Sequence, residues 1–158
     1  MIGYGVIVSR ESKKIITSNR RARHNFAIEK TVEAGLELLG SEVKSLRSGT
    51  ASIAEAFVSF ENRQAFLVGA HIPIYPQAGN DNHTPLRKRK LLMNRKQIAD
   101  WGHASDAQGH SVIPLALYFI GPWIKIELGL GKGRKKYDKR EKLKEQDQKR
   151  EMRRAYRR

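Results

Sequence analysis

The sequence predicts a mainly β fold, an antiparallel barrel of about six short strands with two or three short helices inserted. Apolar and polar residues alternate over several short segments, which is the period of a half-buried strand. Turn-forming residues separate these segments. A sheet of many short strands hides its unpaired edges by closing, so a closed or nearly closed barrel is expected.

The first strand is expected at residues 26–34, where apolar and polar side chains alternate with Lys30 as the one exception. Gly35 interrupts the pattern as a bulge or sharp bend would, and residues 36–39 resume it. Glu33 falls on the polar face of this strand, where a partner can reach it.

A helix of one or two turns is expected next, with Ser41 as its N-cap and Gly49 beyond its C-terminal end. Two apolar segments that flank residues 61–63 predict a β-hairpin. Residues 73–85 are dense in turn formers and predict a loop.

Another short helix is expected to open near Pro85 and to carry the basic run at 87–90 in its first turns. Asn94 followed by Gln97 resembles a capping box for a further helix that ends near Gly102. The last two strands are predicted at residues 111–119 and 123–131.

Charge is the strongest compositional signal. The net charge of +15 divides into +6 for the body (17 basic and 11 acidic residues) and +9 for residues 131–158 (14 basic and 5 acidic). Such a chain is expected to bind nucleic acid or an anionic surface. The longest apolar run is shorter than the roughly 20 residues of a membrane span, so no membrane insertion is expected. The sequence has no cysteine and no clear signal peptide, and a monomer in the reducing cytoplasm is expected.

No enzyme chemistry is predicted. The five histidines are scattered and no zinc-ligand spacing occurs, so neither a metal nor a cofactor is expected. Acidic and amide residues near Asp81 fall in a turn-rich loop, where such side chains mostly cap backbone groups. No Walker loop, nucleophile elbow or zinc-protease motif is present, and no catalytic residue is assigned.

Two basic clusters in the body lie at residues 19–24 and 87–90. Four cations in the first turns of a helix are disfavoured by the helix macrodipole. Their presence at such a position therefore favours binding of an external anionic partner over a merely solvated basic face. The candidate RNA-binding residues drawn from these clusters and from the first helix are Arg20, Arg21, Arg23, His24, Lys44, Arg47, Arg87, Lys88, Arg89 and Lys90.

Five stretches of the chain, from about residue 19 to the C-terminus, together resemble the SsrA-binding protein family, also called small protein B. These are NRRARHNFAIEKTVEAGLELLGSEVKSLRSG, AFLVGAHIPIYP, HTPLRKRKLLMNRKQI, VIPLALYF and KIELGLGKGRKKYDKRE. The resemblance implies an oligonucleotide-binding-like barrel that is not enzymatic. It also implies binding of transfer-messenger RNA (tmRNA), delivered with its alanyl charge and elongation factor Tu to ribosomes stalled without a stop codon.

The family's tmRNA-binding residues fall on Glu33, in the E-A-G motif, and on Leu92 and Asn94, in the K-L-L-x-N motif. The residues alone assign two of these positions differently. Asn94 is a helix N-cap by its spacing, and both roles are compatible. Leu92 is favoured as a core residue by its neighbours, and the resemblance implies that it faces RNA.

The resemblance also implies that the tail is disordered in the free protein and becomes helical in the messenger channel of the stalled ribosome. The family's D-K-R motif is Asp138-Lys139-Arg140, and Tyr137 before it is expected to stack on a base of the decoding centre. Lys135 and Lys136 complete the candidate ribosome-binding residues. The domains expected are an N-terminal extension of uncertain structure (1–18), an RNA-binding barrel (19–131) and a basic tail (132–158).

Helical spacing in the tail pairs Asp138 with Lys142 and Glu145 with Lys149. No continuous apolar stripe accompanies these pairs, so the helix has nothing to pack on the barrel and needs an anionic surface. The alternatives are another basic ribosome-associated protein, a ribonuclease, or a tail on an anionic membrane, which would need an amphipathic helix. The apolar stretch 1–12 departs from the family's polar start, and either a misassigned start or an added strand would explain it.

Overall fold

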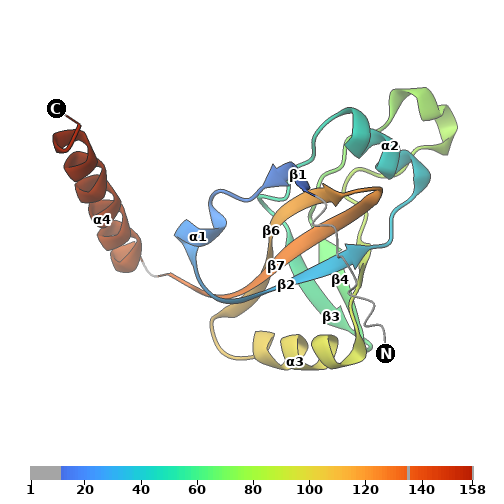
Figure 1. Cartoon of the computed structure of the whole chain (residues 1–158). Coiled ribbons are helices and arrows are strands. Elements are labelled where there is room, and N and C mark those ends of the chain that lie inside the picture. The colour runs from blue at the N-terminus through green and yellow to red at the C-terminus, as the bar shows by residue number, and fades with distance from the viewer. Residues whose placement is uncertain (1–11, 135, 158) are drawn as a thin grey trace, which may run out of the picture.

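Among the residues that the structure describes, seven antiparallel strands form one sheet in the order β1-β6-β7-β2-β5-β4-β3 (Figure 1). The structure is a computed structural model and describes residues 12–134 and 136–157. The prediction of a mainly antiparallel β fold is confirmed. The strands are β1 (Lys13–Ser18), β2 (Phe26–Leu36), β3 (Phe57–Glu61), β4 (Gln64–Val68), β5 (Arg89–Leu92), β6 (His110–Ile120) and β7 (Trp123–Gly133).

The sheet curls over a core but is not closed by hydrogen bonds, because β1 and β3 stand at its two ends. Strand β3 packs against β6 instead. The core lies inside the curl, where Leu46 of the first long helix meets Leu67, Leu117 and Ile126 from the strands, all at most 2% exposed.

The seventh strand, β1, comes from the segment before residue 19 whose structure the sequence left open. It pairs with β6, with Lys14 opposite Phe119 and Ile15 opposite Tyr118. The apolar stretch 1–11 before it lies outside the described residues.

Strand β2 corrects one detail of the sequence interpretation. The irregularity in its pairing with β7 falls between Ile28 and Lys30, not at Gly35. Gly35 is paired with the strands on both sides. A Cβ at this position would lie only 3.2 Å from Leu92 Cβ, so the glycine allows the two strands to pack closely.

In the described part of the chain, five helical segments accompany the sheet: α1 (Ala22–Asn25), α2 (Gly40–Ser48), the 3₁₀ segment η1 (Pro76–Asp81), α3 (Arg95–Ser105) and α4 (Lys136–Ala155). The predicted capping box of α3 is confirmed, since the Gln97 N–H donates to Asn94 Oδ1 at 2.7 Å and Gln97 Oε1 accepts from the Asn94 N–H at 3.2 Å. Ser41 is not the N-cap of α2. The helix begins at Gly40, and the Ser41 hydroxyl bonds to buried His83 Nδ1 at 2.9 Å.

The helix predicted near Pro85 is wrong, because the basic run leads into β5 instead. β5 lies between β2 and β4, and its side chains alternate between the core and the outer face. The predicted hairpin is confirmed, with Asn62 and Arg63 at positive φ (49° and 61°) in the two-residue turn between β3 and β4.

The tail is drawn as the single long helix α4, which projects away from the sheet (Figure 1). It leaves the body beside α1, where the Arg134 N–H donates to the Asn25 carbonyl at 2.8 Å. Within the described part of the chain, no helix has the length and apolar character to cross a membrane.

Candidate RNA interface

A row of paired residues crosses four strands on the outer face of the sheet. Gly35 of β2 lies opposite Leu92 of β5 on one side and opposite Lys125 of β7 on the other, and Lys125 lies opposite Tyr118 of β6. Directly opposite residues of antiparallel strands point to the same face, so these side chains share one surface. Glu33 belongs to the same face, two residues before Gly35. Asn94, two residues after Leu92, is also exposed. We call the exposed residues Glu33, Leu92 and Asn94 the Glu33 surface.

The carboxylate of Glu33 is held in place by its neighbours. The Tyr118 hydroxyl donates to Glu33 Oε2 at 2.5 Å, and Lys13 Nζ lies 4.0 Å from the same oxygen. Lys13 Nζ also lies 4.6 Å from the centroid of the Tyr118 ring. Tyr118 is only 1% exposed, and its burial, together with its hydrogen bond to Glu33, raises its pKa well above the usual value. The Glu33 carboxylate is therefore oriented yet remains open to solvent, with its side chain 42% exposed.

Leu92 lies on the surface, with 54% of its area exposed. The core position favoured by the neighbouring residues is therefore wrong. The alternation in β5 places Leu91 in the core (1% exposed) and Leu92 outside. Sequence reasoning could not choose between the two consecutive leucines without the register of the strand.

Asn94 has the capping role expected of it and remains exposed. Its Oδ1 caps α3, whereas its exposed Nδ2 has no hydrogen-bond partner in residues 12–134 and 136–157. The amide therefore keeps a free donor beside Leu92.

The basic run 87–90 does not act as one patch, and Arg89 is removed from the candidate RNA contacts. Arg89 is 0% exposed, and its guanidinium donates to Glu42 Oε2 (2.9 Å), the Ala70 carbonyl (2.9 Å) and the Pro85 carbonyl (3.0 Å). No face of this side chain is left for a phosphate.

Arg87 shares the same acidic partner, with its Nε donating to Glu42 Oε1 at 2.6 Å. Burial alone would raise the pKa of Glu42, but the hydrogen bonds from Arg87 and Arg89 outweigh it and hold the pKa below the usual value. Lys88 is exposed, pairs with Glu61 at 2.7 Å and lies over the Phe66 ring at 4.3 Å. Of the four, Lys90, which follows on β5, has no ion pair or hydrogen bond from its side chain among the described residues.

The N-terminal cluster lies at a different place on the sheet. Arg20, Arg21 and Arg23 are exposed around α1, and His24 is half-buried. From Phe26, next to α1, to Gly35 the strand β2 covers nine steps, or roughly 30 Å at 3.3 Å per residue. The structure therefore places the cluster and the Glu33 surface at opposite ends of one strand.

Two further candidates, Lys44 and Arg47, are exposed on α2. Lys44 Nζ lies 6.0 Å from the centroid of the Tyr75 ring. In the tail, Lys136, Tyr137, Asp138, Lys139 and Arg140 fall in the first turns of α4, and Lys135 lies outside the described residues.

Sequence reasoning missed Lys13 and Tyr118, which contact the Glu33 carboxylate, and Lys125, which lies opposite Gly35. Each lies on a strand whose register against β2 cannot be read from a single sequence. The alternation in β6 could at most have shown that Tyr118 and Phe119 point to opposite faces.

No metal site accompanies this surface. In the part of the chain that the structure describes, no three histidine or acidic side chains come together as a metal site would need. Buried His83 is instead held by Ser41 and by the Ile72 carbonyl, 2.9 Å from its Nε2.

Comparison with known proteins is consistent across family, relatives and solved structures. The family model described as SmpB protein matches residues 16–158. An SsrA-binding protein of Bacillus pumilus is 46% identical over 144 residues, covering 91% of this chain and 92% of the relative. One of Bifidobacterium longum is 48% identical over 146 residues, covering 92% of each. A solved structure described as "tmRNA-SmpB: a journey to the center of the bacterial ribosome" aligns with a TM-score of 0.65 at 37% identity, covering 76% of this chain and 85% of that one.

Proposed function

Because this chain belongs to the SmpB family, we propose that it is an SsrA-binding protein, which binds tmRNA and acts with it on the ribosome in trans-translation. The relatives named above carry that name, and the aligned solved structure is of tmRNA and SmpB in the bacterial ribosome. The observation that carries the proposal is the exposure of Glu33 and Leu92 on one face of the sheet, with exposed Asn94 two residues after Leu92.

The chemistry of the Glu33 surface suits an RNA with unpaired bases. A carboxylate repels phosphate, so Glu33 has to accept hydrogen bonds from base N–H groups or from a ribose 2′-hydroxyl. Asn94 Nδ2 donates to a base or ribose oxygen, and Leu92 packs on an apolar face of the nucleotide. Such a surface selects a shape of RNA, and affinity comes from cations around it.

The cations that supply this affinity are proposed to be Lys90, near the surface, and the cluster Arg20, Arg21 and Arg23 at the far end of β2. Lys44, Lys88 and His24 extend the footprint, whereas Arg87 is largely engaged with Glu42 and Arg47 lines a pocket elsewhere on the protein. Each phosphate contact adds about 0.7 to 0.9 to the slope of log affinity against log salt concentration, so binding is strongly salt-dependent.

The tail has a separate role in the proposal. It enters the messenger channel of the stalled ribosome as a helix, with Tyr137 stacked on a decoding-centre base and Asp138, Lys139 and Arg140 against ribosomal RNA. Its +9 charge and its lack of an apolar stripe support a polyanionic channel as its binding surface. That the tail is disordered before it reaches the ribosome stays a prediction.

The remaining parts of the proposal concern setting and chemistry. The protein works in the cytoplasm as a monomer, without cofactor or catalysis, and delivers alanyl-tmRNA together with elongation factor Tu. The alternatives are a different basic ribosome-associated protein and a ribonuclease.

Equilibrium binding of labelled tmRNA in the presence of an excess of unlabelled transfer RNA tests the proposed function. The result expected is retention of tmRNA by the protein, with the RNA intact on a denaturing gel afterwards. Equal competition by transfer RNA would point to general basic binding, and cleaved RNA would point to a ribonuclease.

A further inference from the structure

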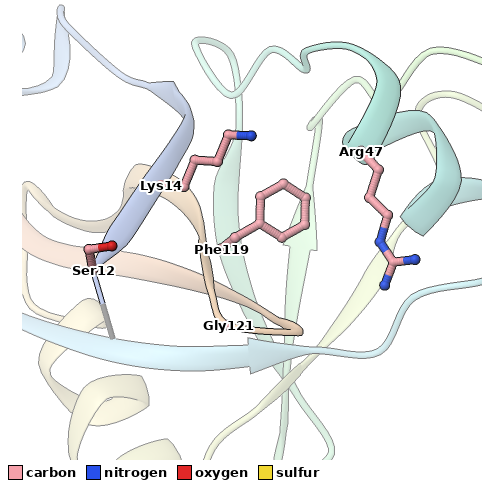
Figure 2. A pocket seen from close by; sticks show the side chains of 5 residues that line it. All are labelled: Ser12, Lys14, Arg47, Phe119 and Gly121. Atoms are coloured by element: carbon pink, nitrogen blue, oxygen red, sulfur yellow. The ribbon is translucent and has the colours of Figure 1, made fainter. Parts of the chain in front are cut away.

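A shallow pocket lies on the side of β1 and β6 that faces away from the Glu33 surface. Lys13 and Tyr118 contact each other on the outer face, and consecutive residues of a strand point to opposite faces. Lys14 and Phe119, which lie opposite each other in the β1–β6 pairing, are therefore on the other side. There they line a pocket with Arg47, Ser12 and Gly121 (Figure 2).

The pocket brings together an aromatic ring and two cations. Phe119 is half-buried, with one part packed against the core and the rest open to the pocket. Figure 2 shows its ring between the side chains of Lys14, from β1, and Arg47, from α2. None of the described lining residues is acidic.

Neither cation has a partner among the described residues that explains its position. In residues 12–134 and 136–157, the side chains of Lys14 and Arg47 make no hydrogen bond, ion pair or ring contact. Arg47 lies in the last turn of α2, where the helix dipole favours a cation. The dipole does not account for Lys14, which reaches the same pocket from a different element.

We propose that this pocket binds one unpaired nucleotide of an RNA, with its base stacked on Phe119 and its phosphates between Lys14 and Arg47. An exposed aromatic face between two cations is what single-stranded RNA recognition uses, because every base has a face to stack and every link carries a negative charge. The inference goes beyond the Glu33 surface. It gives the protein a second RNA contact, on the opposite face of the sheet.

Photocrosslinking of the full-length protein to a single-stranded RNA octamer containing 5-bromouridine tests the pocket. The cross-link is expected on the peptide that carries Phe119, because photoreaction is efficient for a stacked ring. It should be lost in Phe119→Leu, which keeps an apolar side chain, and kept in Phe119→Trp, which keeps a stacking face. Phe57→Leu, at a more exposed phenylalanine on β3, is the control and should change nothing.

Affinity for the octamer supplies a second readout. Loss of one stacked base in Phe119→Leu should weaken binding by about 5-fold or more, and Lys14→Ala with Arg47→Ala should lower the salt slope by roughly 1.4. Lys96→Ala with Arg95→Ala, on the exposed side of α3, gives the charge-matched control. Cross-links confined to other peptides, or a Phe119→Leu variant with normal stability and unchanged affinity, would overturn the proposal.

Two further arms identify the source of the nucleotide. The same photoreaction is run with bromouridine-substituted tmRNA and, separately, with substituted small ribosomal subunits. A Phe119 cross-link to tmRNA or to the small subunit assigns the nucleotide to that RNA. If no Phe119 cross-link forms with tmRNA, the small subunit or the octamer, the proposed nucleotide pocket is refuted. Because tmRNA binding by the wild-type protein is measured independently, failure of the pocket does not imply failure of the proposed function.

Discussion

Replacing Glu33 with alanine should weaken both tmRNA binding and the fold. From the sequence alone, an exposed glutamate on a strand contributes little to stability. In the structure, however, Glu33 accepts the hydrogen bond of Tyr118, which is 1% exposed. The alanine variant leaves that buried hydroxyl without its partner, at a cost of about 1–3 kcal/mol in the free energy of unfolding.

Tyr118→Phe removes the same hydrogen bond from the other side and should cost less. It leaves no buried donor unpaired, and the Glu33 carboxylate, 42% exposed, is hydrated in its place. The double variant should then be more stable than the sum of the two single losses predicts, because the phenylalanine removes the group that Glu33→Ala leaves unpaired.

The assay is urea unfolding of the wild type, the two single variants and the double variant, with tmRNA affinity measured on the same preparations. Glu33→Ala should lose most of the affinity. Tyr118→Phe should lose less, because the carboxylate is still present but no longer oriented. Additive losses in the cycle, with Glu33→Ala as stable as the wild type, would refute the reasoning.

Three other variants test separate parts of the structure. Arg89→Met should destabilise the protein by about 3–5 kcal/mol, because Glu42 is left buried with Arg87 alone. Lys90→Met should weaken RNA binding at unchanged stability. The opposite pattern in unfolding and binding assays would return Arg89 to the RNA surface. Leu92→Ser should reduce tmRNA affinity with less than about 1 kcal/mol change in unfolding, and a loss of 2–5 kcal/mol would mean that the side chain is core after all. Deleting residues 135–158 should leave tmRNA affinity largely intact and abolish peptide tagging in a reconstituted reaction, and normal tagging would contradict a ribosomal role of the tail.

Local pattern was enough to predict several elements. The capping pair Asn94 and Gln97, the hairpin at Asn62-Arg63 and the two long final strands follow from residues close together in the chain. Each depends on a turn, a cap or a period of two, which act over a few residues.

The predictions that were wrong concern residues whose structure depends on contacts distant in the sequence. The basic run 87–90 was predicted as helical because Pro85 precedes it, but its last two residues, Arg89 and Lys90, belong to β5, which pairs with β2 and β4. Burial of Arg89 depends on Glu42, 47 residues away in the sequence, and no local pattern shows that ion pair. Tertiary context overrides propensity at such positions.

In the candidate site, too, local pattern predicted some features, and others depend on residues distant in the sequence. The alternation in β2 correctly places Glu33 on an exposed face. It could not show that Tyr118 of β6 and Lys13 of β1, two strands that do not pair directly with β2, contact its carboxylate. It also could not choose the exposed leucine of β5, because a shift of one residue exchanges Leu91 and Leu92 between core and surface.

The most direct test of the account is peptide tagging on ribosomes stalled at the end of a message that lacks a stop codon, supplied with alanyl-tmRNA and elongation factor Tu. We expect the nascent chain to be tagged only when this protein is added, and tagging to fall with tmRNA affinity in the Glu33→Ala variant. Tagging that proceeds equally without the protein, or that is absent although the protein binds tmRNA, would contradict it.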